Sequence, residues 1–406
     1  MGTLSVQSYR WVIVAYSLVI QAVSFGILIY CFALFTLPWL DEFGASRRDI
    51  MLTISALQIG TALVGPFVGR YLDQVNLRSV VFLGLLALIL GLYLVRAATA
   101  LWQIWLVYVT LMPLATLMMG TLASQTLIAK WFETERGLAL GLSAIGTSIG
   151  GVIFPWLVAG WLMDFGWRET LHLLAMAALV LVVPLTLIVL RRQPPAAKIS
   201  GEALQTVSGE DRSWSTREIL STALFWLPFV AFIPISMGFS ALQFNLGVFT
   251  RDLGLDDQAA APLIMTSSVC MIIGKLFFGG LGDRLDHRFL YWVSMSLLCC
   301  AYVTLLVTDS YEGLFVGVVC MGLAGGGILP LLGVIFGSRF GVASFGRVMG
   351  LVGVVMMFGA LAPLIFGWVY DIQGSYDIAL ISLLAVAIPA MIAMFWLPQP
   401  SVSAPD

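Results

Sequence analysis

Long apolar runs separated by short polar or charged segments dominate the pattern of hydrophobic and polar positions in this chain. A helix that crosses the hydrocarbon layer of a membrane needs about 20 mostly apolar residues. Runs of that length, bounded by charges or turn residues, predict twelve membrane-spanning helices. They cover residues 11–39, 50–69, 79–97, 101–129, 137–160, 170–190, 222–249, 262–281, 289–308, 313–337, 347–369 and 376–397.

The composition excludes several classes of protein. Hydrophobic residues make up 60% of the 406 residues and charged residues only 10%, which is typical of an integral membrane protein and not of a soluble domain. A net charge of −2 without a basic run gives no sign of nucleic-acid binding. The five cysteines lie in apolar runs without the spacing of a metal site, so we expect neither a metal nor another cofactor.

The positive charges predict the orientation of the chain. An even number of spans puts both termini on one side of the membrane. If the N-terminus, alternate loops and the long central loop face the cytoplasm, that side collects fourteen of the 20 Lys and Arg residues and the opposite side five. This asymmetry follows the positive-inside rule. We therefore expect a multi-pass protein of the plasma or inner membrane with both termini cytoplasmic.

The longest polar segment, 191–220, divides the predicted spans six and six. We therefore expect an N-terminal six-helix bundle over 1–190, a cytoplasmic linker over 191–220 and a C-terminal six-helix bundle over 221–406. The loop GRYLDQVNLR after the second span matches GGLGDRLDHR after the eighth at a constant offset of 210 residues. Two parallel halves of similar build are typical of secondary carriers, whose substrate site lies between the halves near the membrane midplane.

The pattern Gly-x-x-x-Asp-x-x-x-x-Arg in both loops resembles the cytoplasmic motif of the major facilitator superfamily. WFETERGLALGLSAIG (131–146) is similar to the fifth-span signature of the monocarboxylate transporters and the oxalate/formate antiporters, and LDEFGASRRDIMLTISA (40–56) is similar to their first outer loop. The resemblance covers nearly the whole chain. It implies an all-α membrane protein in which twelve transmembrane helices form two pseudo-symmetric six-helix bundles, and a secondary active transporter that works by alternating access.

One cation, Lys275, belongs to neither side of the membrane. The cytoplasmic end of the eighth span lies close to Gly282 and Asp283, seven or eight residues after Lys275. This spacing puts Lys275 about 10–12 Å inside the cytoplasmic edge of a core ~30 Å thick. Helical periodicity places it on one stripe with Ser268, Met271 and Gly279, with Ser267 beside them, while Ile272, Leu276 and Phe277 point elsewhere. A charge at this depth is costly and indicates a function. The alternative is a lysine that reaches for the interface or bonds a backbone carbonyl in a helix contact.

In the monocarboxylate and oxalate carriers that the sequence resembles, a cation on the eighth span binds the substrate carboxylate, and the pair Gly274-Lys275 matches that position. All 22 Asp and Glu residues fall in loops, tails, the linker or the ends of spans. An ammonium at Lys275 therefore either loses its proton or holds a diffusible anion. We expect a small organic anion, a mono- or dicarboxylate, as the substrate.

Two coupling mechanisms stay open. Relatives that run as proton symporters carry an aspartate four residues before the cation, and here that position is Met271. The protein then either exchanges one anion for another or works as a symporter in which Lys275 itself gains and loses the proton. We expect a monomer in the bilayer that uses protons or a counter-anion.

Hydroxyl and amide groups at suitable depths are further candidates for contacts with the anion. Such groups also hold membrane helices together, and that alternative stays open for each of them. Tyr30 is favoured because spans 1 and 7 line the cavity in the superfamily that the sequence resembles. The candidates are Tyr30, Tyr108, Ser143, Thr147, Gln243, Asn245 and Ser268.

The repeated loop and the tenth span carry candidate gating residues. By resemblance, the loop contacts hold the halves together on the cytoplasmic side, with the loop glycines allowing close helix approach and Asp73 meeting the positive N-terminal end of the eleventh span. The alternative is that loops simply collect charges. GLAGGGILPLLG (322–333) contains three consecutive glycines and a proline, so we expect this helix to bend as a gate. The gating candidates are Gly69, Asp73, Arg78, Gly279, Asp283, Arg284 and Gly326.

Other functions fit the sequence less well. An enzyme would need a nucleophile with a base or a pair of acids, yet the only histidines, His172 and His287, lie near predicted membrane edges. A passive anion channel would also use a cationic site, but the twofold repeat favours alternating access. A proton-coupled multidrug or metabolite efflux carrier of the same superfamily is the nearer alternative.

Overall fold

The computed structural model describes residues 6–132, 136–191, 214–256, 259–282, 284–308 and 310–398, and every regular element among them is a helix. The first are α1 (Val6–Phe25), the π-helical turn η1 (Gly26–Tyr30), α2 (Phe32–Phe43), α3 (Arg47–Gln74), α4 (Leu77–Arg96), α5 (Leu101–Met119), α6 (Thr121–Trp131) and α7 (Arg136–Val189). The others are α8 (Thr216–Ser221), α9 (Ala223–Asp252), α10 (Ala260–Leu281), α11 (His287–Val307), α12 (Tyr311–Gln373), α13 (Asp377–Ala393) and the 3₁₀ turn η3 (Met394–Trp396). The predicted all-α fold class is confirmed.

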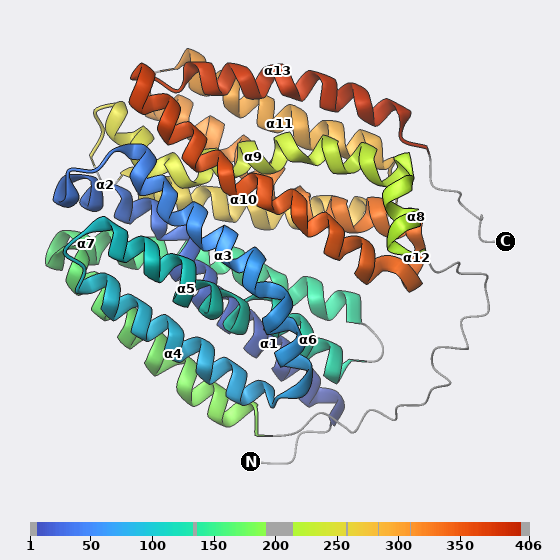
Figure 1. The fold of residues 1–406 in the computed structure, drawn as a ribbon, viewed down its shortest axis with the longest axis horizontal. Coiled ribbons are helices and arrows are strands. Elements are labelled where there is room, and N and C mark those ends of the chain that lie inside the picture. Colours follow the sequence, from blue (N-terminus) through green and yellow to red (C-terminus); the bar gives the residue numbers. More distant parts are fainter. Residues whose placement is uncertain are drawn as a thin grey trace. The chain divides into compact units, whose positions relative to one another are not determined.

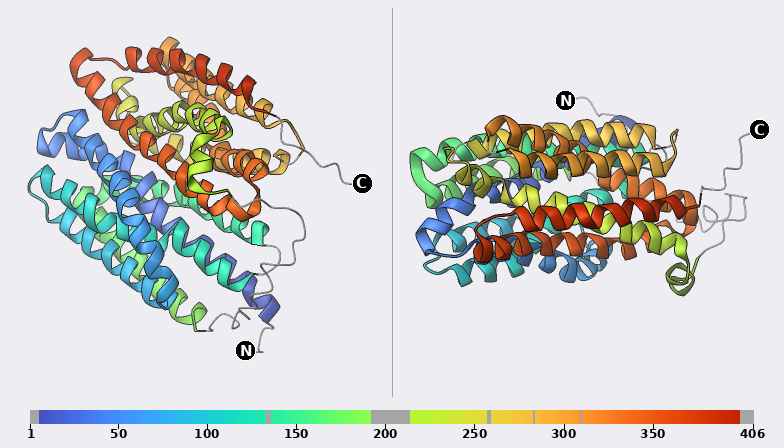
Figure 2. Two further views of the ribbon diagram at one scale, coloured as in Figure 1. Left: turned by 45° about the vertical axis from the view of Figure 1, so that its right-hand side comes forward. Right: turned by 90° about the horizontal axis from the view of Figure 1, so that it is seen from above.

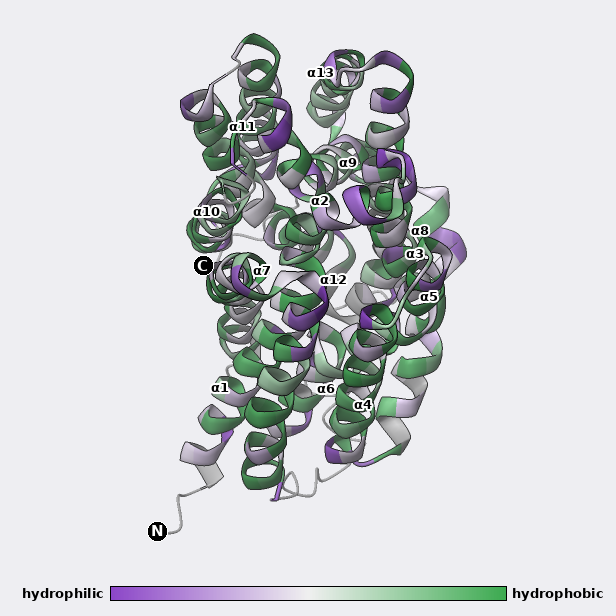
Figure 3. Cartoon of the chain, turned by 90° about the vertical axis from the view of Figure 1, so that its left-hand side faces the viewer, coloured by the Kyte–Doolittle hydropathy of each residue, from purple (hydrophilic) through white to green (hydrophobic). Residues whose placement is uncertain are grey.

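Eleven helical segments in the described residues are long and apolar enough to cross a membrane. One of them, Leu138–Val189, has 52 residues, enough for two passes, and turns at Gly166, whose φ of 73° suits glycine. It holds the fifth and sixth predicted spans, so all twelve predicted spans are present. Hydrophobic residues line the middle of helices such as α1 and α4, and hydrophilic ones gather at helix ends (Figure 3).

Short polar side chains fix where several helices begin. Ser46 accepts a hydrogen bond from the backbone N–H of Asp49 at 3.2 Å at the start of α3, and Asn76 accepts one from that of Arg78 at 3.0 Å at the start of α4. Ser310 does the same for Gly313 at the start of α12. Such caps satisfy the free N–H groups of a first turn, and they set the helix starts close to the predicted span boundaries.

The first of two compact units contains residues 1–198 and 244–268. Within it α1 packs along α7, and α5 packs against both α3 and α4 (Figure 1, Figure 2). The hydroxyl of Tyr16 on α1 bonds that of Thr186 on α7 at 2.8 Å. This unit includes the last turns of α9 because units follow packing and not chain order. The predicted division into 1–190 and 221–406 remains a prediction.

The second unit contains residues 199–243 and 269–406. In it α11 packs against α12 and α13. The hydroxyl of Tyr291 on α11 donates to the carbonyl of Ala231 on α9 at 2.8 Å. The backbone N–H of Trp214, just before α8, donates to the hydroxyl of Ser344 at 2.7 Å. The end of the predicted linker is therefore anchored to α12.

Candidate functional site

Helix α10 has two different faces, and Lys275 lies at the edge of the protected one. Ser268 is fully buried and Met271 is buried, whereas Leu276 and Phe277 are 62% and 46% exposed. The prediction that Leu276 and Phe277 point away from the stripe is confirmed, whereas Ile272 is half-buried and Gly279, expected on the stripe, is exposed. Lys275 itself is half-buried and lies six residues before the end of α10, about 9 Å along the helix axis.

Two glycines bring the backbones of α10 and α12 together beside Lys275. A Cβ at Gly274 would lie 2.3 Å from the carbonyl oxygen of Leu323. A Cβ at Gly326 would lie 2.4 Å from the carbonyl oxygen of Met271 and 2.8 Å from the backbone nitrogen of Lys275. Only glycine fits such a crossing. The backbone that carries Lys275 is therefore held directly against α12.

The glycines on either side of Gly326 in α12, Gly325 and Gly327, also pack closely against large side chains. A Cβ at Gly325 would lie 2.3 Å from the ring of Phe239 on α9, and one at Gly327 would lie 2.5 Å from the ring of Phe278 on α10. The three glycines thus form three packing contacts in the second unit. The sequence suggested flexibility here, and the structure adds close packing as a second reason for the same residues. Gating by Gly326 remains a prediction.

Tyr30 ends the π-helical turn between α1 and α2. The backbone N–H of Cys31 bonds the carbonyl of Gly26 at 3.0 Å, the longer spacing of a π-helix. The Tyr30 hydroxyl is hydrogen-bonded to the side chains of Ser148 on α7 and Ser268 on α10. Such turns are frequent at functional sites because they redirect the side chains that follow. The structure thus brings together two predicted site residues, Tyr30 and Ser268.

Gly151 on α7 makes room for this group. A Cβ there would lie 2.1 Å from the hydroxyl oxygen of Ser268 and 2.7 Å from the ring of Tyr30. Sequence reasoning missed both Gly151 and Ser148. The small residues of the stretch GTSIGG (146–151) were the available signal, since small residues mark close helix contacts in membranes.

Ser143 lies in the contact between α1 and α7. The side-chain amide of Gln21 donates to both the carbonyl and the hydroxyl oxygen of Ser143, each at 3.0 Å. One and two turns further along α7, Cβ atoms at Gly146 and Gly150 would each lie 2.2 Å from a carbonyl oxygen of α1. The hydroxyl of Thr147 donates to the carbonyl of Ala144 at 2.9 Å. The hydroxyl of Ser143 is therefore engaged in helix packing, and that of Thr147 bonds its own helix.

The remaining candidate contacts, Tyr108, Gln243 and Asn245, are buried. The ring of Tyr108 on α5 packs edge-on against Phe32 and Trp39 of α2, with centroids 6.3 and 6.1 Å away. Asn245 is fully buried in the first unit, and Gln243 is buried in the second. The structure describes these positions, and their contact with substrate remains a prediction.

The loop glycines have few neighbours among the residues that the structure describes. A Cβ at Gly69 would meet nothing within 4 Å, and one at Gly279 would only touch Pro330 at 4.0 Å. The expectation that these glycines allow close helix approach remains a prediction. The guanidinium of Arg78 lies over the ring of Phe82, and Arg284 is exposed. Asp283 and the side chain of Asp73 lie outside the described residues.

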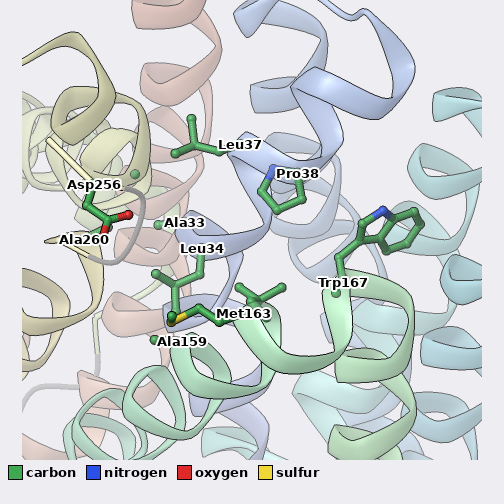
Figure 4. Close-up of a pocket in the computed structure, with 12 residues that line it drawn as sticks. Ala33, Leu34, Leu37, Pro38, Ala159, Met163, Trp167, Asp256 and Ala260 are labelled. Carbon is green, nitrogen blue, oxygen red and sulfur yellow. The ribbon is translucent and has the colours of Figure 1, made fainter. Parts of the chain in front are cut away.

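The first unit also contains a cavity of about 370 Å³ at the end where α2 meets α3. Figure 4 shows Leu34 and Pro38 of α2, Met163 and Trp167 of α7, and Asp256 around it. The walls are mostly apolar, and among the described residues that line the cavity the carboxylate of Asp256 is the one charged group. An anion would be repelled by that carboxylate, so this cavity is not the expected anion site.

Comparison with known proteins agrees with the helical membrane fold. The profile of the Major Facilitator Superfamily matches residues 14–308 and 248–406. An uncharacterised transporter of this type, YcxA from Bacillus subtilis, is 23% identical over 90% of both chains. Monocarboxylate transporter 12 of Xenopus laevis is 25% identical over 86% of this chain and 80% of its own. Monocarboxylate transporter 13 of Bos taurus is 24% identical over 91% and 84%.

The fold is similar to a solved structure as well. A bacterial homologue of the human lysosomal transporter Spinster, in an inward-facing and occupied conformation, superimposes with a TM-score of 0.73 at 16% identity, over 98% of this chain and 97% of that one. Fold and relatives together define a multi-pass membrane transporter for small molecules. The chain belongs to the major facilitator superfamily, with relatives among the monocarboxylate transporters.

Proposed function

We propose that the protein is a secondary active transporter of small organic anions, mono- or dicarboxylates, and that Lys275 binds the carboxylate group. The observation that carries the proposal is the position of Lys275, a half-buried cation inside the apolar helix α10, on the edge of its protected face. A charge at such depth is costly, and it marks substrate or ion pathways in membrane proteins. The names of the monocarboxylate relatives support the same substrate class.

The physics favours an anion that is bound and released again. A hydrogen bond between an ammonium and a carboxylate is worth about 1.5–3 kcal/mol, which corresponds to about 10- to 150-fold in affinity. That strength suits a carrier, because the substrate must also leave. The crossing of Gly274 and Gly326 supports the proposal as well, since it fixes the backbone of Lys275.

We propose alternating access between the bundles 1–190 and 221–406, with coupling to protons or to a counter-anion. The distribution of Lys and Arg supports a plasma or inner membrane location with both termini cytoplasmic. We further propose that the chain acts as a monomer and has no enzymatic activity.

Uptake into proteoliposomes tests the substrate class. The panel contains radiolabelled mono- and dicarboxylates, a neutral amide of the same shape and a lipophilic cation. We expect saturable uptake of at least one carboxylate and none of the amide. Uptake of the lipophilic cation alone would contradict the proposal and favour the multidrug carrier instead.

The same vesicles distinguish the coupling modes. Stimulation by an inward proton gradient indicates symport, and stimulation by preloaded unlabelled carboxylate without a gradient indicates exchange. Lys130→Ala serves as a matched control for substitutions of Lys275, because the Lys130 ammonium donates to the carbonyl of Leu72 at 3.3 Å within the first unit. We expect near-normal uptake by this control.

A further inference from the structure

Two ion pairs join the end of α9 to the turn between α2 and α3. Both guanidinium nitrogens of Arg251 donate to the two carboxylate oxygens of Asp41, each at 2.7 Å. Arg47 donates to Asp252 through both terminal nitrogens, one of these bonds measuring 2.6 Å. Both pairs are therefore bidentate, which is the strongest geometry for an arginine and a carboxylate. All four residues belong to the first unit.

On each of the two facing segments, one residue of the ion pairs is positive and the other is negative. The neighbours Arg251 and Asp252 carry opposite charges, and each meets its opposite on the facing segment. If α9 slipped so that the partners were exchanged, Arg251 would face Arg47 and Asp252 would face Asp41. Both contacts would then be repulsive. The arrangement thus holds the two segments together and also fixes how they align.

Close helix packing continues beside these pairs. A Cβ at Gly247 would lie 2.1 Å from the carbonyl oxygen of Ala33, so α9 touches the backbone of α2. The ring of Phe244 meets that of Phe32 edge-on at 6.0 Å between centroids. This contact explains why Phe244–Ser268 belongs to the same compact unit as residues 1–198. The contact lies at the Phe43 end of the first span, the end opposite to Val6. There the turn between α2 and α3 packs against the end of α9, about two hundred residues later in the sequence.

We propose that Asp41–Arg251 and Arg47–Asp252 form a clasp that holds this end of the transporter closed, and that its release is a step of the transport cycle. A transporter that alternates access must open each end in turn, so a contact between the predicted halves at one end has to break. The inference concerns the conformational cycle and does not depend on which substrate is carried.

The exposure of the clasp makes it reversible. The side chains of Arg251 and Asp41 are 35% and 62% exposed, and those of Arg47 and Asp252 are 13% and 25% exposed. Ion pairs of this kind contribute weakly and are screened by salt. We therefore expect each pair to change the ratio of closed to open molecules by about two- to fivefold, and both together by about 4- to 25-fold if they act independently.

The chain offers a matched control at the same end. Arg96 at the end of α4 pairs with Glu169 on α7 at 2.5 Å, with exposures of 34% and 49%. This pair is joined through one N–O contact and has an exposure similar to that of Arg251 and Asp41, but both of its residues lie within 1–198. Breaking it removes an ion pair without affecting the contact to α9.

Distance measurement by pulsed electron spin resonance tests the clasp. Spin labels at Ala45→Cys and Leu253→Cys, on either side of the ion pairs, are placed in a chain whose five native cysteines are replaced, in lipid nanodiscs. We expect Arg47→Gln with Arg251→Gln to increase the ratio of the long-distance to the short-distance population by about 4- to 25-fold relative to the labelled parent. The swap Asp41→Arg with Arg251→Asp should restore part of the short-distance population, and Glu169→Gln should change nothing.

Salt provides a second measurement on the unsubstituted clasp. Raising the ionic strength from about 0.01 M to 1 M shortens the Debye length from about 30 Å to 3 Å, so the longer distance should gain population. Distances unaffected by both salt and the Gln substitutions would overturn the proposal. So would an equal shift in the Glu169→Gln control. Loss of carboxylate uptake has no bearing on either readout, so the clasp and the proposed substrate class fail separately.

Discussion

Lys275 and Tyr30 each place a polar group among apolar helices, but the two sites are built differently. At Lys275 the backbone is fixed, because Gly274 and Gly326 let α10 and α12 touch. At Tyr30 the side chain is fixed, because its hydroxyl bonds two serines on neighbouring helices. A buried ion costs far more than a buried hydroxyl. Under the proposed function, we therefore expect Lys275 to supply the charge for recognition and Tyr30 to supply shape and a neutral hydrogen bond.

The largest effect is expected for the charge itself. Lys275→Ala should abolish carboxylate uptake in proteoliposomes, because it removes the cation that binds the anion. Lys275→Arg should retain part of the uptake, since it keeps the positive charge but places it on a planar guanidinium instead of a compact ammonium. Wild-type flux in the alanine variant would refute the assignment, provided that Lys130→Ala behaves as wild type.

The next effect is expected for the backbone contact that positions Lys275. Gly326→Leu should slow uptake by about fivefold or more while membrane insertion stays intact, because overpacking at a backbone contact costs about 1–3 kcal/mol and must move α10. Gly333→Leu is the matched control on the same helix, two turns further on, where a Cβ would meet nothing within 4 Å. Equal effects of the two substitutions on the initial rate of uptake would show that transport does not depend on the contact between Gly326 and the backbone of α10.

A smaller effect is expected at Tyr30. Tyr30→Phe should lower stability by about 1 kcal/mol, because the serines lose a partner, and should raise the KM for uptake a few-fold. Tyr16→Phe removes a similar buried hydroxyl, which bonds Thr186 at 2.8 Å. We expect the control to lower thermal stability in detergent to a similar extent without changing KM. If both variants share one KM, Tyr30 has no role in binding.

The smallest effect is expected at Ser143. Because its hydroxyl accepts a bond from Gln21, Ser143→Ala should lower the free energy of unfolding by about 0.5–1 kcal/mol and leave KM within about twofold of wild type. Thermal unfolding and uptake kinetics measure the two quantities. A large rise in KM would instead place Ser143 in the substrate site, as its sequence position first suggested.

The sequence was sufficient for the features that depend on composition and periodicity. Span boundaries followed from apolar runs, and the capping residues Ser46 and Asn76 explain why α3 and α4 start close to the predicted points. The two faces of α10 followed from helical spacing, since Leu276 is exposed and Ser268 buried. Lys275 was recognisable because a charge in an apolar run is conspicuous in any sequence.

The features that depend on tertiary contacts could not be predicted. The π-helical turn Gly26–Tyr30 has no distinct composition, and it is stabilised by packing, for example of Gly26 against Phe154. A run of glycines predicts flexibility and close contact equally well, so the role of Gly326 beside Lys275 needed the neighbouring helix. The partner of Arg251 also lies 210 residues away, and no local pattern identifies it.

Equilibrium binding to the purified protein tests the central claim most directly. A radiolabelled carboxylate that the wild type transports is titrated against wild type, Lys275→Ala and Lys275→Arg in detergent, with its neutral amide as competitor. The account predicts that Lys275→Ala binds the carboxylate about 10- to 150-fold more weakly than wild type and that the amide does not compete. Equal affinities for wild type and the alanine variant would contradict it.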